Sequence, residues 1–339
     1  MKSFDEMRES SGKDLPADSP ADPLMDESKA PAGTGAAGKK AGCVILFNPQ
    51  PSVISNIGTY FSSLDLLILV DNSPVKDLVL LDRLRQNPGK LVYKWLGCNE
   101  GVASALNIAC RIAIENECEW LLTMDQDSRF NESGAASLFQ LTGPVRDRHA
   151  GVGIITPYHR VNEVFIEWHE EKFSVIPATM TSGNLLYLRA WSSIGGFEEK
   201  LFIDYVDFEF CLRLRKNGFQ VIQVNQIYLE HSLGDFRIKN FFGRKVGISN
   251  HNFIRRYYIT RNKLYTIRKY FHFDRSFCLV ILKSLLGDGL RVLFYEKDRY
   301  RKLRAMFTGM LHFMFNRYGV YAGKGNDVNK NINANRDIE

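Results

Sequence analysis

Residues 119–130 read EWLLTMDQDSRF, and this stretch holds the most informative pattern of the chain. An apolar run from Trp120 to Met124 ends in two carboxylates, Asp125 and Asp127. Because strand residues alternate faces, both carboxylates can converge on one point. In open α/β sheets, ligands bind outside the carboxyl ends of the strands. Paired carboxylates there suit a hard divalent cation that carries substrate phosphates, and a solvated turn is the alternative from this stretch alone.

The composition indicates a globular protein with one large domain or one domain and an appendage. The chain has 339 residues, of which 45% are hydrophobic and 24% are charged. Its six cysteines form no CxxC pair and sit mostly in apolar runs, so they predict reduced core residues of a cytoplasmic protein. We find no convincing secretory signal, and charged residues interrupt the most apolar stretch, 277–294, which argues against a membrane-spanning helix.

Charge is distributed unevenly along the chain. Residues 1–30 hold eight acidic and four basic residues, whereas residues 237–304 hold 18 lysines and arginines against four acidic residues. A basic block of that size usually meets an anionic partner, such as nucleic acid, acidic lipid or a phosphorylated substrate. A set of solvated helix faces is the alternative.

The order of apolar and polar runs predicts four segments. Residues 1–41 hold few large apolar side chains and are expected to form a disordered leader, because they cannot bury enough surface to offset their ordering entropy. An α/β domain is predicted over 42–236, a helical, basic and aromatic extension over 237–322, and a flexible tail over 323–339.

Within the α/β domain, short apolar runs alternate with helical patterns. Strands are predicted at 43–47, 66–70, 91–95, 120–124 and 152–156, with helices near 51–63, 75–86 and 101–117. This alternation indicates βαβ units and a mainly parallel, Rossmann-like sheet. Further along, strands are predicted near 184–188 and 220–224, and a helix from about 205 to 217 that ends at Gly218.

Polar groups follow each of the first four strands. They are Asn48, the Asp71-Asn72 pair, Asn99 with Gly101, and the Asp125–Asp127 turn. Such turns would line one edge of the sheet, the expected place for a nucleotide. Asp71 could accept a hydrogen bond from a pyrimidine ring N–H, although Asp-Asn-Ser is also an ordinary turn.

Two glycine-containing segments could let backbone approach a ligand. Gly101 opens the helix GVASALNIA, which also carries Asn107. A tightly packed helix explains the alanines equally well but explains Asn99 and Asn107 less well. Gly183, in TSGNLLYLRAW, could face a sugar or could simply begin a strand.

A second acidic cluster and a histidine complete the candidates. Asp204, Asp207 and Glu209 lie at the start of the helix predicted from 205. The helix dipole accounts for one or two of these carboxylates. Their apolar neighbours suggest that at least one lies in a partly apolar cleft and can act as a general base. His231, in YLEHSLGD, follows a strand where a metal or diphosphate ligand could stand, although a lone histidine is more often structural.

In order and spacing, these motifs resemble the inverting family 2 glycosyltransferases of GT-A fold, over about residues 43–270. DQDS at 125–128 resembles the Asp-x-Asp motif that binds metal and nucleotide sugar. VDFEFCLR at 206–213 resembles the stretch with the catalytic base, which puts Asp207 at the base position and Val206 where the family has a glutamate. LEHSLGD resembles the family's His-x-x-Gly segment, which implies that His231 lies near the metal and diphosphate.

Two further segments sharpen the resemblance. NEGVASALN resembles the family's Asn-x-Gly-x-Ala-x-Ala-x-Asn helix. RRYYITRNKLY at 255–265 resembles the Tyr-Tyr-x-x-Arg-Asn segment of the rhamnosyltransferase-like branch. Arg261 could there meet the donor diphosphate, since a planar cation suits phosphate. A helix packed under the sheet is an equal alternative.

The resemblance implies a single GT-A domain that transfers a sugar, with dTDP-L-rhamnose as the favoured donor. It implies that Asp71 and Asn99 hold the base and ribose, that Asp125 contacts ribose or metal, and that Asp127 and His231 bind Mg²⁺ or Mn²⁺. Asp207 would deprotonate an acceptor hydroxyl, and one displacement would invert the anomeric configuration.

The expected acceptor is a glycan or glycolipid, namely a growing polysaccharide that is linked to a lipid. The protein is expected in the cytoplasm, at the inner face of the cytoplasmic membrane, and no nucleic-acid partner is expected. Residues 299–319 mix basic with apolar residues as interfacial helices do, and a core or dimer-interface helix is the alternative. The oligomeric state is not predicted.

Other classes fit less well. A dehydrogenase needs a glycine-rich phosphate turn after the first strand, where this chain has FNPQP. A sugar-phosphate nucleotidyltransferase needs a Gly- and Lys/Arg-rich loop at the same place. A non-catalytic membrane or nucleic-acid binding adaptor would explain the basic block but not the ordered carboxylates.

Overall fold

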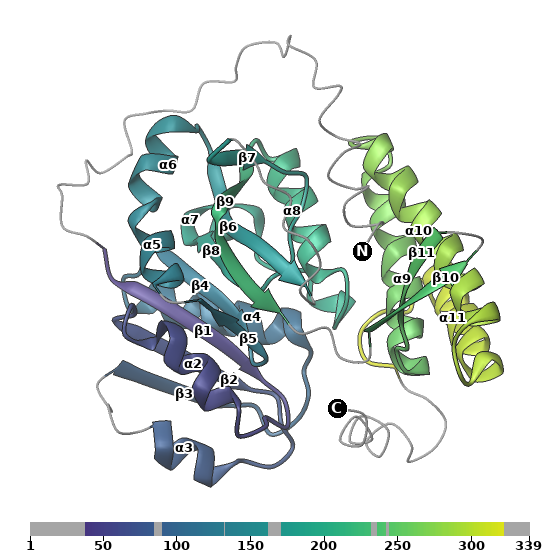
Figure 1. Ribbon diagram of the computed structural model, residues 1–339, viewed down its shortest axis with the longest axis horizontal. Helices are drawn as coiled ribbons and strands as arrows, with labels where there is room; N and C mark the ends of the chain where they lie inside the picture. The colour runs from purple at the N-terminus through teal and green to yellow at the C-terminus, as the bar shows by residue number, and fades with distance from the viewer. Residues whose placement is uncertain are drawn as a thin grey trace.

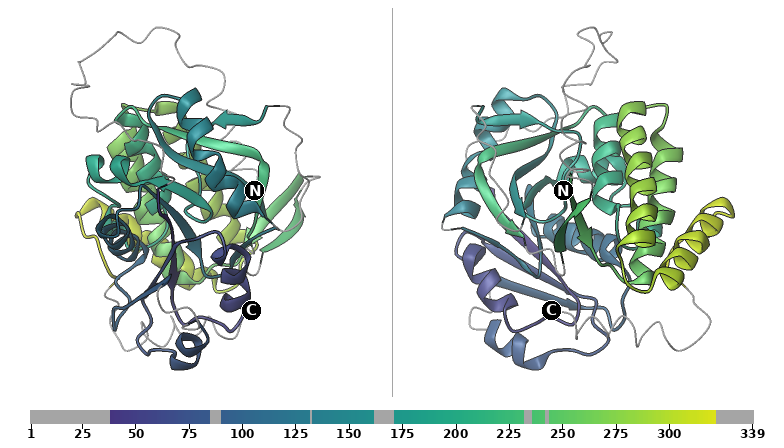
Figure 2. Two further views of the ribbon diagram at one scale, coloured as in Figure 1. Left: turned by 90° about the vertical axis from the view of Figure 1, so that its left-hand side faces the viewer. Right: turned by 45° about the vertical axis from the view of Figure 1, so that its right-hand side comes forward.

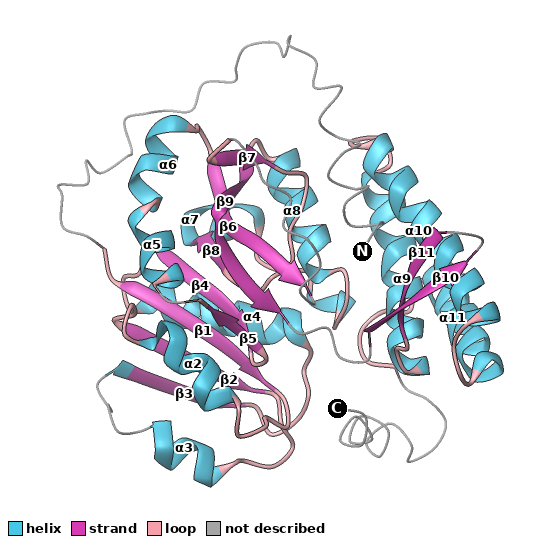
Figure 3. Cartoon of the chain, viewed as in Figure 1, coloured by secondary structure: helices cyan, strands magenta, loops and turns pink. Residues whose placement is uncertain are grey.

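The computed structural model describes residues 38–84, 90–131, 133–161, 171–231, 236–241 and 244–321. A nine-stranded mixed sheet carries helices on both faces, and three long C-terminal helices form a further layer beside it (Figures 1 and 3). The predicted leader up to residue 37 and the predicted tail from 323 lie outside the described residues.

The first half of the sheet is parallel, as predicted. Its strands are β1 (Lys40–Leu46), β2 (Leu66–Asp71), β3 (Leu91–Trp95) and β4 (Trp120–Asp125), in the order β3-β2-β1-β4. The connections carry helices α2 (Val53–Phe61), α3 (Leu78–Leu84) and α4 (Val102–Glu115). Central strands such as β2 are apolar and buried along their whole length, because helices cover both faces. Strand β1 begins at Lys40, so the leader boundary predicted at 41 is slightly too late.

The parallel core that the sequence predicted is confirmed, and the second half of the sheet adds mixed pairing to it. It contains β5 (Ser128–Phe130), β6 (Val152–Val161), β7 (Phe173–Val175), β8 (Asn184–Tyr187) and β9 (Gln220–His231). The order continues β4-β8-β6-β9-β5, with β7 also on β9. Only β6 and β9 pair in parallel. Strand β5 follows β4 after two residues, a connection too short for a parallel crossover.

Two apolar cores lie on the two faces of the sheet. Helix α2, with α5 (Gly134–Gln140) and α6 (Thr142–Arg148), packs on one face through residues such as Ile57 and Leu138. Helix α4, with α7 (Leu188–Ile194) and α8 (Val206–Lys216), packs on the other face through residues such as Ala105 and Phe210. The small side chains of α4 are fully buried, so this helix lies close to the sheet.

The C-terminal part begins with strands, which corrects the prediction that it is helical from residue 237. Strands β10 (Phe236–Phe241) and β11 (Arg244–Ser249) form an antiparallel pair. Apolar residues at 236, 238, 246 and 248 alternate with other residues, and this period of two favours strands. Helices α9 (Phe253–Tyr270), α10 (Arg275–Phe294) and α11 (Arg299–Met314) follow, and both α10 and α11 pack on α9 (Figure 2).

Part of the basic block is buried rather than solvated. Arg256 of α9 pairs with Asp288 of α10 and with Glu296, and Lys263 lies 2.5 Å from Asp288. Lys302 of α11 lies 2.9 Å from Glu296. Burial raises the pKa of Asp288, but the neighbouring cations outweigh it and lower the pKa to about 2. These ion pairs join the three helices, so the alternative of solvated helix faces is wrong for these residues.

All six cysteines are free thiols in the described part of the chain, and five of them are buried, as predicted. Cys98 is the exception, because it is exposed. No helix among the described residues is both long enough and apolar enough to cross a membrane.

Candidate active site

The two carboxylates of DQDS lie at the carboxyl edge of the sheet, as predicted. Asp125 is the last residue of β4, beside Ile45 of β1. Gln126 fixes the following turn, because its Oε1 accepts a hydrogen bond of 2.9 Å from the backbone N–H of Phe47. Asp127 therefore follows directly on a segment held to the end of β1.

The end of β9 lies next to this turn. His231 is the register partner of Ser128, the residue after Asp127, so its backbone is adjacent to the DQDS segment. The side chain of His231 lies outside the described part of the structure. Among the described residues, no group of three or more His, Cys, Asp or Glu side chains could hold a metal ion alone. The carboxylates of Asp125 and Asp127 are hard oxygen donors, which fit Mg²⁺ or Mn²⁺ when phosphate oxygens complete the coordination.

The polar turns after β1, β2 and β3 are joined by hydrogen bonds. The N–H of Asn48 donates to Ser73 Oγ over 2.8 Å. The Asn72 side chain accepts from the N–H of Glu100 and donates to the carbonyl of Gly101, each over 3.2 Å. These contacts gather Asn48, Asp71, Asn72, Asn99 and Gly101 at one edge of the sheet, as the sequence predicted.

Asp71 is fixed at this edge by two neighbours. The side chain is buried, its Oδ1 accepts from the N–H of Ser73 over 2.8 Å, and its Oδ2 accepts from the Tyr93 hydroxyl over 2.6 Å. Burial and this carboxylate raise the pKa of Tyr93, so the tyrosine stays a donor. Each carboxylate oxygen keeps a further lone pair, so Asp71 retains the capacity to accept from a base. Sequence analysis had not identified Tyr93.

Asp207 lies in the first turn of α8 and has a perturbed carboxyl. Its Oδ1 accepts from the N–H of Phe208 over 2.9 Å. Burial raises the pKa of Asp207 from 3.8 to about 7, and the nearby charges of Asp204 and Asp125 contribute to the rise. The preceding residue is Val206, which is buried and apolar, so this position adds no charge next to Asp207. A carboxyl group with a pKa near 7 can both accept and release a proton at neutral pH.

The loop before α8 has a strained backbone. Phe202, Asp204 and Tyr205 have φ angles of 68°, 60° and 67°, in the left-handed region. Such conformations persist only where surrounding structure enforces them. Gly101 takes part in this: a Cβ atom there would lie 2.6 Å from the carbonyl oxygen of Phe202, and the N–H of Val102 donates to that oxygen over 2.8 Å. The close approach ties the turn after β3 to the loop that precedes Asp207.

Arg261 and Asn262 of α9 brace the same loop from the other side. Arg261 is fully buried, and its Nη2 donates to the carbonyls of Lys200 and Leu201. Asn262 Nδ2 donates to the carbonyls of Leu201, Ile203 and Asp204 at 2.7–2.9 Å.

The remaining donors of Arg261 are also used within the protein. Nη1 donates to the Gly319 carbonyl and the Tyr257 hydroxyl, and Nε donates to Asn262 Oδ1. These bonds favour the packing alternative for Arg261 over contact with a diphosphate.

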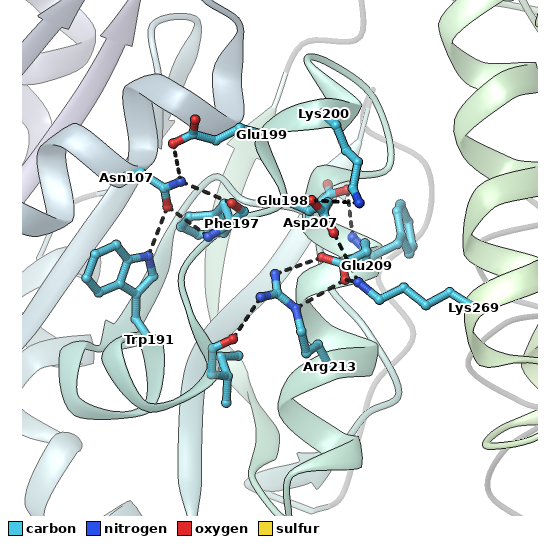
Figure 4. A network of polar contacts seen from close by, with 12 residues as sticks. Asn107, Trp191, Phe197, Glu198, Glu199, Lys200, Asp207, Glu209, Arg213 and Lys269 are labelled. Carbon is cyan, nitrogen blue, oxygen red and sulfur yellow. Dashed lines mark hydrogen bonds and ion pairs between the residues drawn. The ribbon is translucent and has the colours of Figure 1, made fainter. Parts of the chain in front are cut away.

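Asn107 also has its hydrogen-bonding groups occupied by protein (Figure 4). Its Nδ2 donates to the Phe197 carbonyl and to Glu199, and its Oδ1 accepts from the N–H of Phe197 and from Trp191. The buried side chain thus holds the segment after α7 to α4. The packing alternative accounts for Asn107 without a nucleotide.

Glu209, the second acidic residue of α8, is an internal anchor (Figure 4). It is fully buried and accepts hydrogen bonds from Arg213, Lys269 and Tyr270 at 2.6–3.1 Å. These contacts tie α8 to α9 two residues after Asp207.

Gly183 has φ 81°, and its N–H donates to the Thr123 carbonyl over 2.7 Å, which places it between β4 and the start of β8.

Arg255 lies at the candidate site, although no sequence motif pointed to it. Its Nε donates to Asp204 Oδ1 over 3.1 Å, while Asp204 Oδ2 is buried without a hydrogen-bond partner. The charge of Asp204, and to a smaller extent those of Asp125 and Asp127, raise the pKa of Arg255, so the positive charge of this arginine is stabilised by the carboxylates near the end of β4. The side chain is about half exposed, at 48%. The available signal was Asn252, a helix N-cap three residues earlier, which places Arg255 in the first turn of α9.

The sheet, with Asp125 and Asp127 at its carboxyl edge and the raised pKa of Asp207 near them, indicates a glycosyltransferase of GT-A type. The model of the family "Glycosyl transferase family 2" matches residues 52–212, which include Asp71, Asp125, Asp127 and Asp207. Over these residues the chain is similar to this family, and the chain is a glycosyltransferase, as the motifs predicted.

Two known proteins illustrate the likeness. Over 249 residues the chain is 29% identical to the dTDP-rhamnosyl transferase RfbF of Shigella flexneri, across 67% of this chain and 79% of that protein. The structure of GalNAc-T7 with UDP, GalNAc and Mn²⁺ superposes with a TM-score of 0.52 at 11% identity, across 68% of this chain. The match spans 48% of the GalNAc-T7 chain, and at this identity it supports the GT-A fold alone.

Proposed function

We propose that this glycosyltransferase moves L-rhamnose from dTDP-L-rhamnose onto a hydroxyl group of a growing, lipid-linked polysaccharide, with inversion at the anomeric carbon. The observation that carries the proposal is the placement of Asp207. Its carboxyl is buried in the first turn of α8, close enough to Asp125 at the end of β4 for that charge to contribute to a pKa of about 7. The choice of rhamnose rests on the similarity to the Shigella flexneri dTDP-rhamnosyl transferase.

The donor nucleotide would lie along the turns after β1, β2 and β3. Asp71 would accept a hydrogen bond from the base, since Tyr93 and Ser73 hold its carboxylate in one orientation. Asn48, Asn72 and Asn99 would border the base and ribose, and Asp125 would contact ribose or metal. The hydrogen bonds already joining these turns mean that little ordering is needed on binding.

Asp127, with Asp125 and His231, would hold a Mg²⁺ or Mn²⁺ ion. When bound, such an ion neutralises the charge that develops on the departing nucleoside diphosphate. Arg255 would add a second positive charge near the diphosphate, because the charges of Asp125 and Asp127 already act on it.

Asp207 would act as the general base. In its ionised form it takes the proton of the acceptor hydroxyl as that oxygen attacks the anomeric carbon. The new glycosidic bond forms as the bond to the diphosphate oxygen breaks, so one displacement inverts the configuration. The strained loop at 202–205 and its braces fix the position from which Asp207 works.

The acceptor would be a glycan carried on a lipid, met at the inner face of the cytoplasmic membrane. The exposed cations of the C-terminal helices support this location, because that face of the membrane is anionic. Residues 299–319 correspond mainly to α11, which packs on α9 and also presents exposed apolar side chains.

A panel of nucleotide sugars tests the proposal. dTDP-rhamnose, UDP-glucose, UDP-galactose and GDP-mannose are compared by thermal stabilisation with and without Mg²⁺ or Mn²⁺. We expect a metal-dependent shift with dTDP-rhamnose that Asp127→Ala abolishes and that Asp147→Ala, on the exposed surface of α6, leaves intact. Stabilisation by a different sugar nucleotide, and not by dTDP-rhamnose, would identify that nucleotide as the donor instead. An absence of any shift would favour the adaptor that uses the basic extension.

A further inference from the structure

Exposed apolar side chains are concentrated in the C-terminal helices. Of the described residues, 17 large hydrophobic side chains are exposed, and 13 of these lie between 273 and 320. Five leucines form one line along α10, with spacings of three or four residues: Leu279, Leu282, Leu286, Leu290 and Leu293. Residues so spaced share one face of a helix. We name this line the leucine stripe.

The opposite face of α10 is already occupied. Phe277, Ile281 and Val292 are at most 1% exposed, and they face the protein interior. By contrast, Leu286 and Leu290 of the leucine stripe are 64% and 57% exposed. A helix that is apolar on both faces is normally buried on both, so the stripe calls for a second apolar environment.

Helix α11 extends the exposed apolar surface. Its buried positions include Ala305 and Gly309, and a Cβ at Gly309 would lie 2.6 Å from the carbonyl oxygen of Tyr257 in α9. Phe307, Met310 and Met314 lie away from this contact line and are 41–60% exposed. Figures 1 and 2 show α10 and α11 on the side of the molecule away from the sheet.

The charges around this surface are almost all positive. The stretch 271–321 holds four acidic residues, and three of them are engaged in ion pairs: Asp274 with Arg215, Asp288 with Lys263, and Glu296 with Lys302. Asp298 is the one that is exposed. Exposed cations lie on both helices and on the link between them: Arg275 and Lys283 on α10, Lys297 in the link, and Arg301 and Arg304 on α11.

We propose that the leucine stripe and the apolar face of α11 insert into the interfacial region of an anionic lipid bilayer. Apolar residues bordered by cations are the pattern of helices that lie in that region. A second copy of this chain fits less well, because joining two stripes would bring Arg275, Lys283 and Lys297 of both copies together with little negative charge. The proposal extends the proposed function, since it supplies the surface on which a lipid-linked acceptor would be met.

The leucine stripe also ends near the part of the protein that holds Asp207. Arg256 of α9 pairs with Glu296, just after the end of α10. Its neighbour Arg255 contacts Asp204 in the loop before Asp207. The C-terminal end of the stripe therefore lies at the end of α9 that meets the active site, where an acceptor anchored in the bilayer could reach Asp207.

Tryptophan fluorescence of the full chain tests insertion directly. Leu286→Trp should show a blue-shifted emission on vesicles of phosphatidylglycerol and phosphatidylcholine, and no shift on phosphatidylcholine alone. Leu78→Trp is the matched control, since Leu78 is 65% exposed on α3, outside the C-terminal helices. In co-sedimentation, Leu286→Glu/Leu290→Glu should lower the vesicle-bound fraction on the order of tenfold, whereas Leu78→Glu should not.

Two outcomes would overturn the proposal. One is a wild-type chain that does not bind phosphatidylglycerol vesicles at low salt. The other is a wild-type dimer in light scattering that the double glutamate variant converts to a monomer, which would assign the stripe to a second copy. Thermal stabilisation by dTDP-rhamnose, measured on the same variants, separates the two ideas: vesicle binding without donor binding would reject the proposed function alone.

Discussion

The Nε atom of Arg255 lies 3.1 Å from Oδ1 of Asp204, and this contact joins the first turn of α9 to the strained loop before α8. The second oxygen of Asp204 is buried without a hydrogen-bond partner. The same arginine experiences the charges of Asp125 and Asp127. Arg255 therefore contacts one carboxylate and is influenced by the charges of two more, so a diphosphate bound near the end of β4 would compete with Asp204 for it.

Replacement of Arg255 should weaken donor binding more than turnover. We expect Arg255→Ala to raise the KM for the nucleotide sugar by about tenfold or more, because a charge-assisted contact to phosphate is lost. Steady-state kinetics with a soluble acceptor give KM and kcat separately. Arg189→Ala, an exposed arginine on α7, is the control. An unchanged donor KM in Arg255→Ala would mean that this arginine only holds Asp204 and does not contact the diphosphate.

Replacement of Asp207 should abolish transfer and spare donor binding. Asp207→Asn keeps the shape of the side chain but cannot accept the acceptor proton, so the transfer rate should fall by a factor on the order of 10²–10⁴. Calorimetry should show that donor binding is preserved. Asp147→Asn on α6 serves as the matched control. Near-normal turnover by Asp207→Asn would remove this residue from the base role.

The raised pKa of Asp207 predicts a specific pH dependence of stability. Burial, with Asp204 and Asp125, raises the pKa of the folded state from 3.8 to about 7. The unfolded chain therefore releases this proton at lower pH than the folded chain, so ionisation costs the wild type stability as the pH rises from about 4 to about 7. Asp207→Asn does not pay this cost.

The measurement is urea unfolding of metal-free protein at pH 5 and pH 8. The quantity to compare is the free energy of unfolding of Asp207→Asn minus that of the wild type. This difference should be larger at pH 8 than at pH 5, by on the order of 1 kcal/mol or more. A difference that is the same at both pH values would mean that Asp207 ionises with an ordinary pKa.

Short-range patterns in the sequence were enough to predict much of the site. The apolar strands ending in Asp71 and Asp125 fix which residues stand at the sheet edge, because the carboxyl ends of parallel strands share that edge. Helix α8 and the position of Asp207 in its first turn also followed from the local pattern. These features depend on residues close together in the chain.

The remainder depended on contacts between distant residues. Asn107 and the Phe197 backbone are 90 residues apart in the chain, and a motif at Asn107 does not reveal that partner. The Tyr93 contact with Asp71 and the Arg255 contact with Asp204 are likewise contacts of the folded chain. The antiparallel strand β5 was missed because three residues are too few for a hydrophobic period to register.

Arg261 and Asn262 should act as positioning residues for Asp207 rather than as donor ligands. Asn262→Ala removes three hydrogen bonds to the carbonyls of Leu201, Ile203 and Asp204. We expect the free energy of unfolding to fall by about 2–4 kcal/mol, since buried carbonyls lose their partners. The kcat should fall as the loop relaxes, while the KM for the donor stays nearly constant.

Arg261→Lys tests the same brace through geometry, because lysine keeps the charge but has three N–H groups on one nitrogen, which cannot reach all five partners of the planar guanidinium. We expect it to lower the melting temperature and kcat, whereas Arg268→Lys, at an exposed position of the same helix, should change neither. A donor ligand would behave differently: Arg261→Lys would then raise the donor KM without lowering the melting temperature. The buried guanidinium and its five protein partners argue for the brace, since no N–H group of Arg261 is left to reach a diphosphate.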